Sequence, residues 1–221
     1  MRTLLHLSDL HFGRVDDSLV GPLVTAARAI APDLVIVSGG FSPRARRMGY
    51  PAARAFLARM PEPQLVVPGN HDIPLWDVIR RFVSPLGRYR RYISRELMPF
   101  YEDDEISVLG INTARSLTRK YGRINARQIE EAGKILAAVR PNVVKVVVTH
   151  HPFDVPPGSR SHLVGRAVMA MEGLAKSGVD FLLACHLHLR STGLQARCRW
   201  GWCLCGKVRS GLRPVRVDQR E

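Results

Sequence analysis

The chain of 221 residues lacks any long hydrophobic run. No apolar stretch approaches the roughly 20 residues that a helix needs to cross a bilayer. The first residues, MRTLLHLSDLHF, have no separate charged, apolar and cleavage regions, so they are typical of a first strand and not of a signal peptide. The sequence therefore argues against a membrane partner and predicts a cytoplasmic protein.

Cysteines and phosphate-binding loops are also scarce. There are only four cysteines, and three of them, Cys198, Cys203 and Cys205, are crowded near the end of the chain. This spacing fits neither a disulfide framework nor the two CxxC pairs of a structural zinc site. Ser38-Gly39-Gly40 ends an apolar run, but no GxxxxGK[ST] or GxGxxG pattern follows it. A glycine-rich loop that cradles phosphate is therefore excluded there.

Acidic residues are few as well. The chain has 19 Asp and Glu against 33 Lys and Arg, which gives a formal net charge of +14. A basic chain attracts phosphates, nucleic acid or anionic surfaces. Because much of the excess lies in residues 189–221 and the remainder is spread out, a solvated basic face is the favoured interpretation and nucleic acid is the less favoured partner.

The apolar pattern predicts an α/β domain. Six runs are mostly continuously apolar, as strands covered on both faces tend to be: Thr3–Ser8, Leu34–Ser38, Gln64–Pro68, Glu105–Ile111, Val143–Thr149 and Val179–Cys185. Helical patterns separate several of them: Leu19–Ile30, a helix starting at Pro51, one capped by Asn125 and Gln128, and Val164–Lys176. Residues 84–104 fit this rhythm poorly and are interpreted as a lid, a loop or a surface helix.

Histidines gather where the predicted strands end. The chain has eight histidines, and six of them follow strands in four clusters: SDLH, GNHD, THHP and CHLH. A lone histidine beside a strand is more often structural than functional. Because the carboxyl ends of neighbouring parallel strands meet at one edge of a sheet, four such clusters predict one shared site.

The residue types in these clusters suit metal ions. Asp oxygen and His nitrogen are good ligands for Zn, Mn or Fe, and Asn adds a neutral oxygen. The candidate ligands are Asp9, His11, Asn70, His150, His186 and His188. Six ligands are more than one tetrahedral ion uses. The sequence therefore predicts two divalent ions about 3.5 to 4 Å apart, an arrangement that promotes attack on phosphorus.

DLH, GNHD, THHP and HLH, in this order, resemble the motifs of the calcineurin-like metallophosphoesterase superfamily. SPLGRYRRYI, FYEDDEISVLGINTARS and GRINARQI are similar to its bacterial cyclic-nucleotide phosphodiesterase branch. The resemblance implies a metallophosphoesterase domain over residues 1–188, built as a four-layer sandwich of two mixed β-sheets flanked by helices. It further implies hydrolysis of a small phosphodiester by a metal-activated hydroxide.

The resemblance also implies roles for single residues. One ion would be held by Asp9, His11 and His188, and the other by Asn70, His150 and His186. His71 would be the general acid that protonates the leaving oxygen, and Asp72 would orient its ring. A carboxylate beside an imidazole fixes its tautomer and raises its pKa, which suits that role. His151 is expected to support the site without binding a metal.

The chain departs from the family pattern at three places. Gly40 stands where an aspartate bridges the two ions, so an aspartate restored there is predicted to raise metal retention and rate. Cys185 replaces a glycine, as a passive thiol or, less favoured, a thiolate ligand. Residues 189–221 form an atypical tail without strand alternation, interpreted as out of frame, disordered, or ordered but unusual. A catalytically weak homologue and a nuclease of the same superfamily are therefore the alternative functions.

Overall fold

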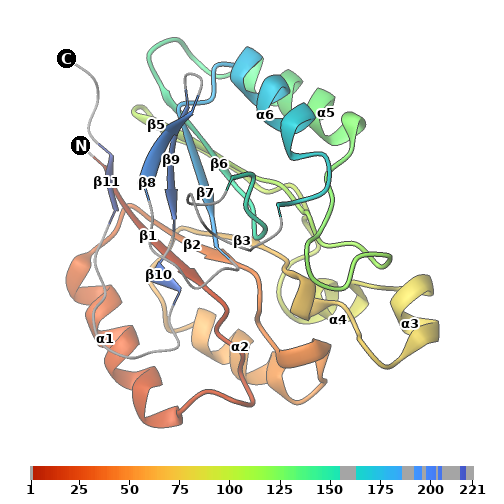
Figure 1. Cartoon of the computed structure of the whole chain (residues 1–221). Coiled ribbons are helices and arrows are strands. Elements are labelled where there is room, and N and C mark those ends of the chain that lie inside the picture. The colour runs from red at the N-terminus through yellow and green to blue at the C-terminus, as the bar shows by residue number, and fades with distance from the viewer. Residues whose placement is uncertain are drawn as a thin grey trace.

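The computed structural model describes residues 2–154 and 163–185 (Figure 1). It also describes the backbone of four short strands between residues 192 and 217. Two of the predicted ligands, His186 and His188, lie outside the described residues. None of the helices in the described part of the chain has the length and apolar composition needed to cross a bilayer.

The first sheet is built around the N-terminal strand. β1 (Arg2–Ser8), β2 (Leu34–Ser38) and β3 (Gln64–Val67) pair in parallel in this order. On the other edge of β1, β10 (Leu204–Cys205) pairs in parallel and β11 (Val215–Val217) pairs antiparallel. The sheet is therefore mixed.

The second sheet has the order β4-β5-β6-β7-β9-β8. Its neighbours from β5 to β9 pair in parallel, whereas β4 and β8 join the two edges antiparallel. Its strands are β4 (Phe100–Glu102), β5 (Ile106–Gly110), β6 (Val144–Val148), β7 (Phe181–Ala184), β8 (Thr192–Gln195) and β9 (Cys198–Trp202).

The two sheets pack face to face, and helices cover their outer faces (Figure 1). Alternation along β1 shows the layering, since Leu5 and Leu7 pack toward the helices and Leu4 packs toward the second sheet. The predicted four-layer sandwich of two mixed sheets is confirmed. The helices are α1 (Val20–Ile30) and α2 (Gly49–Leu57) on the first sheet, α5 (Ala126–Ala137) and α6 (Ala167–Lys176) on the second, and the short α3 (Val78–Val83) and α4 (Gly87–Tyr92).

All six predicted strands are present, with ends that differ by no more than two residues. The predicted capping box is also present, because Asn125 and Gln128 each accept a hydrogen bond from the other's backbone at the start of α5. Residues 84–104 are not a lid. They form α4 and the edge strand β4, and the buried Tyr89 donates its hydroxyl to the carbonyl of Val66 at 3.1 Å.

Strand structure continues beyond residue 188, contrary to expectation. β8 and β9 extend the second sheet, and β10 and β11 pair with β1 of the first. The pairing of β10 and β11 with β1 joins segments far apart in the sequence, and strands this short show no alternation that would predict them. The boundary at residue 188, the reading-frame hypothesis and the proposed disorder of the tail stay predictions.

His6, in β1, makes the stability of the fold depend on pH. It lies on the same side of the strand as Leu4, and its Nε2 is 2.7 Å from the hydroxyl of Ser38. Burial, and next the nearby His150, lower the pKa of His6 to about 3. A proton therefore binds the unfolded chain more readily, so stability is complete above pH 6.5 and is lost as the pH falls toward 3.

We expect this histidine alone to remove about 2 kcal/mol of unfolding free energy between pH 7 and pH 5. Urea unfolding of the wild type and of His6→Gln at both values measures it, because glutamine keeps a polar group but does not titrate. The difference between the two proteins isolates His6 from other groups. An equal loss in both proteins would show that His6 is not responsible.

Candidate metal centre

Loops that follow β1, β2, β3 and β6 meet at one edge of the sandwich. The backbone N–H groups of Asp9 and His11 donate to the carbonyls of Gly39 and Gly40, at 3.0 and 2.7 Å. The His150 ring contacts the end of β2 and the loop after β3. Its Nδ1 lies 2.7 Å from the Ser38 carbonyl, and its Nε2 lies 3.0 Å from Asn70 Oδ1. Three of the four predicted clusters are thus brought together. The fourth, at His186 and His188, lies outside the described residues.

Gly39 makes this close approach feasible. A Cβ atom on Gly39 would lie 2.5 Å from the Cα of Gly69 and 2.6 Å from Nδ1 of His150. Its φ of +75° also belongs to the left-handed region that side chains disfavour. The glycines after β2 therefore serve packing, because they let three loops touch.

The His150 ring presents a lone pair to its neighbours. The Ser38 carbonyl can only accept a hydrogen bond, so the ring must carry its proton on Nδ1. Nε2 then points with a lone pair at Asn70 Oδ1, while the Asn70 Nδ2 group donates to the Arg119 carbonyl at 3.4 Å. Asp9 Oδ1 lies 4.0 Å from the same Nε2. Three acceptor atoms that face one another favour a cation between them.

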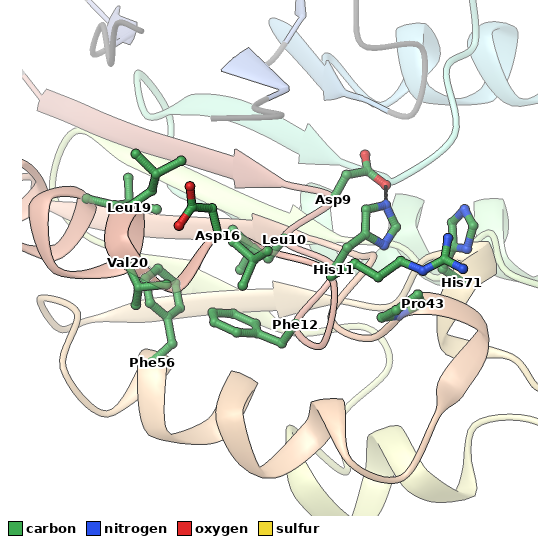
Figure 2. A pocket seen from close by; sticks show the side chains of 13 residues that line it. Asp9, Leu10, His11, Phe12, Asp16, Leu19, Val20, Pro43, Phe56 and His71 are labelled. Carbon is green, nitrogen blue, oxygen red and sulfur yellow. Dashed lines mark ion pairs between the residues drawn. The ribbon is translucent and has the colours of Figure 1, made fainter. Parts of the chain in front are cut away.

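Asp9 and His11 form a second pair of donors. Figure 2 shows the two side chains pointing toward each other, with His11 Nε2 3.4 Å from Asp9 Oδ1. Both residues hold a positive φ, of +54° and +49°. Non-glycine residues in this conformation are uncommon and cluster at functional sites, where surrounding contacts hold them in place. Nδ1 of His11 is buried and has no hydrogen-bond partner among the described residues.

His71 lies beside this pair. Its ring meets the His11 ring edge to face, with centroids 4.7 Å apart. Burial, and next the proximity of His11, lower the pKa of His71 to about 4. The ring is therefore neutral at pH 7.

The carboxylate of Asp72 is held by backbone groups and not by His71. It is fully buried and accepts backbone N–H groups from Gly40, Phe41 and Gly69, at 3.0, 3.1 and 2.9 Å. The Tyr50 hydroxyl lies 3.4 Å from it. Burial raises the pKa of Asp72 to about 6, while the bonds from Gly69 and Gly40 oppose that rise. Within the described residues the predicted orienting role has no hydrogen bond to carry it, and Asp72 instead ties the loop after β2 to the loop after β3.

We therefore expect Asp72→Asn to reduce stability. The asparagine amide would face a backbone N–H group, and a buried donor left without an acceptor costs about 1 to 3 kcal/mol. Chemical unfolding at pH 7 checks this against Asp77→Asn, which removes a carboxylate that is exposed and caps α3. If Asp72→Asn lost activity while keeping full stability, the orienting role would have to be restored.

Two further residues behave differently from each other. His151 is fully buried, and its Nδ1 lies 2.7 Å from the Thr113 hydroxyl, which fits the supporting role expected of it. Cys185 is buried and disulfide-bonded. Its sulfur is therefore not a thiolate available to a metal, and the spacing of the cysteines gave no sign of this bond.

The donor set fits divalent metal ions in type. Asp9 with His11, and Asn70 with His150, supply one pair of donors for each predicted ion, and the two pairs meet near Asp9 Oδ1. Among the residues that the structure describes, however, no three His, Cys, Asp or Glu side chains are grouped to hold a metal ion. The described residues thus provide two half-sites, and the predicted third ligands, His188 and His186, lie outside them.

Sequence reasoning missed the Ser38 carbonyl and Tyr50, which hold His150 and the Asp72 loop. Main-chain acceptors carry no signal in a sequence. Tyr50 lies just before the helix predicted to start at Pro51 and inside the observed α2, and its contact with a loop 22 residues away could not be inferred from spacing.

Comparison with solved structures supports the fold. A purple acid phosphatase from yellow lupin (Lupinus luteus) superposes with a TM-score of 0.68 at 12% identity, over 97% of this chain and 47% of the lupin chain. A dimetal phosphatase from Danio rerio gives 0.67 at 12% identity, over 91% of this chain and 86% of that one. The protein TT1561 of Thermus thermophilus gives 0.62 at 12% identity, over 91% and 88%. This chain spans about half of the lupin enzyme.

No curated protein matches this chain significantly. The family model for calcineurin-like phosphoesterases matches residues 2–190, which is most of the sequence. The two half-sites at the sheet edge lie within the matched residues. The chain therefore belongs to the calcineurin-like phosphoesterase family.

Proposed function

We propose that this protein is a phosphodiesterase that cleaves a small phosphodiester, with His71 as the general acid. Membership of the family supports a metal-dependent phosphoesterase in general. The observation that carries the finer proposal is the position of His71, which lines a cavity together with Asp9 and His11 and packs against the His11 ring. A proton donor at this place can reach an ester oxygen held beside the predicted ligands.

The residues that would hold the metal ions are Asp9 and His11 for one ion and Asn70 and His150 for the other, completed by His188 and His186. When bound, divalent ions polarise the phosphate and stabilise the negative charge that develops on it. Among the described residues, Asp9 supplies the buried carboxyl group that faces both His11 and His150.

His71 requires a proton before it can act. Its low pKa comes first from burial, which disfavours the charged imidazolium. A phosphate anion beside the ring favours that same charged form and so raises the pKa toward neutrality. Substrate binding would thus load the acid that later protonates the leaving oxygen.

Hydrolysis of bis(p-nitrophenyl) phosphate tests the proposal. We expect activity that is abolished by a chelator and restored by Mn, Fe or Zn, and a preference for the diester over p-nitrophenyl phosphate. Asp9→Asn should lose both metal and activity, because it keeps the shape of the side chain and removes its charge. Activity that does not depend on metal, or that prefers the monoester, would contradict the proposal.

A catalytically weak homologue is the second candidate, and Gly40 favours it. The described half-sites meet at Asp9 Oδ1, but no carboxylate projects from Gly40 to share the two ions. Two divalent cations at short range repel strongly when no anion lies between them. Elemental analysis after dialysis separates the candidates, since a weak homologue should retain at most one ion per chain.

A further inference from the structure

A cavity of about 590 Å³ opens directly from the candidate centre. Asp9, His11 and His71 form one end of it, and the other end is formed by α1 and α2 (Figure 2). Pockets of about 300 to 1,000 Å³ are typical of sites for small molecules. The position of this cavity means that a phosphate held at the histidines could extend one ester group into it.

The walls of this cavity are mainly apolar. Within the described residues, the polar side chains besides the three at the centre are Arg14 and Asp16, both exposed to solvent. The apolar lining consists of Leu10, Phe12, Val15, Leu19, Val20, Leu23, Pro43 and Phe56. Several of these side chains are only half-buried, although they pack on the core beneath. They therefore keep apolar surface that a ligand could cover.

This lining discriminates between kinds of ester group. A nucleobase carries several hydrogen-bonding atoms on its edge, and a buried polar group without a partner costs free energy. An alkyl or aryl group has no such atoms, and it gains affinity for every part of its surface that leaves water. The chemistry of the walls thus favours an apolar group over a base.

We infer that the cavity beside His11 and His71 is a specificity pocket for an alkyl or aryl group esterified to the phosphate, an inference that rests on the proposed phosphodiesterase function. Asp9, His11 and His71 line the pocket and also belong to the proposed phosphate site, so one continuous site would hold the apolar group and the phosphate. Arg14, the cation among the described lining residues, lies at the exposed rim, where it can pair with a phosphate oxygen.

Binding of alkyl phosphonates from methyl to hexyl, measured by calorimetry on the full-length protein, tests the inference. These probes have a carbon–phosphorus bond and are not hydrolysed as esters. We expect affinity to rise by roughly two- to fourfold per added methylene, as burial of apolar surface requires. Affinity that does not change with chain length, or no detectable binding of hexyl phosphonate, would overturn the inference.

Leu23→Gln is the matching variant. Glutamine keeps a similar size and a good helix propensity within α1 but places a polar group in the wall. It should weaken hexyl phosphonate at least tenfold and leave methyl phosphonate unchanged, a split that a merely unfolded variant cannot produce. Val168→Gln, on the exposed face of α6, is the control and should bind both probes like the wild type. An equal loss for both probes in Leu23→Gln would count against the pocket.

The outcomes also separate this inference from the proposed function. If affinity depends on chain length but no phosphodiester is cleaved, the pocket stands and the phosphodiesterase function fails. If bis(p-nitrophenyl) phosphate is cleaved but the affinity for alkyl phosphonates does not depend on chain length, the proposed function stands and the apolar specificity fails.

Discussion

Replacing His71 with alanine is expected to lower turnover by about 10²- to 10⁴-fold, the usual contribution of a general acid. The ring packs edge to face on His11 and lines the cavity, but it is not assigned as a metal ligand. Metal content should therefore change little. Turnover of a phosphodiester, measured alongside elemental analysis, provides both readouts.

His71→Asn serves as the matched variant, because it fills part of the space beside His11 with a group that does not titrate near neutrality. Both variants should lose less activity on an ester whose leaving group is very acidic, since such a group departs without a proton. If metal were lost in step with activity, His71 would be a ligand. An equal loss for acidic and basic leaving groups would also rule out the role of proton donor.

Gly40→Asp is expected to destabilise the protein by about 2 to 5 kcal/mol, combining left-handed strain with an overpacked contact. A Cβ atom at Gly40 would lie 2.7 Å from the Asp9 Cα and 2.8 Å from Asp9 Oδ1, and the φ of Gly40 is +69°. The side chain would thus enter beside Asp9, where the family resemblance predicts a bridging carboxylate, but its Cβ would lie too close to the Asp9 backbone. Chemical unfolding at pH 7 measures the loss.

Gly40→Asp is also expected to raise metal retention and rate, and a control must separate this gain from the effect of the strain. Gly40→Ala is the matched control, because it brings the same Cβ clash without a charge. We expect the two variants to lose similar stability. Gly40→Asp should retain more metal than Gly40→Ala. Equal metal content in the two variants would mean that Gly40 is not the vacated bridge. Wild-type stability in both would show that the loop yields freely.

The position of the site could be predicted in part, because the sequence shows where each strand ends and because the carboxyl ends of parallel strands meet at one edge of a sheet. Apolar runs located β1, β2, β3 and β6, and parallel pairing aligns the ends of β1, β2 and β3, which carry Asp9 and Asn70. His150 follows β6 in the other sheet, so its position depends on how the two sheets pack, which the sequence did not predict. The role of Asp72 in orienting His71 came instead from the family resemblance. The hydrogen bonds of Asp72 could not be predicted from the sequence, because its partners are backbone N–H groups at Gly40, Phe41 and Gly69, which almost any residue type could supply.

For residues 84–104 the sequence left a lid, a loop and a surface helix open, and it did not predict the strands beyond residue 188, for a related reason. Mixed aromatic and arginine residues give no sign of the contacts that hold α4, among them the burial of Tyr89 and its hydrogen bond to Val66 of the first sheet. The strands β8 to β11 are at most five residues long, which is too short for an alternation of polar and apolar residues to be recognised. β10 and β11 also depend on β1, a partner roughly 200 residues away in the chain, and not on their own composition.

The pairing of β1 has a consequence for the order in which the chain can fold. One edge of β1 is paired early by β2, but the other edge receives Leu204–Cys205 and Val215–Val217, roughly 200 residues later. During synthesis that edge stays open while almost all of the chain emerges, and unpaired strand edges recruit other chains. Any truncation before residue 204 would leave the edge open permanently. Chaperone capture of nascent chains is therefore expected to persist until the last strands are released.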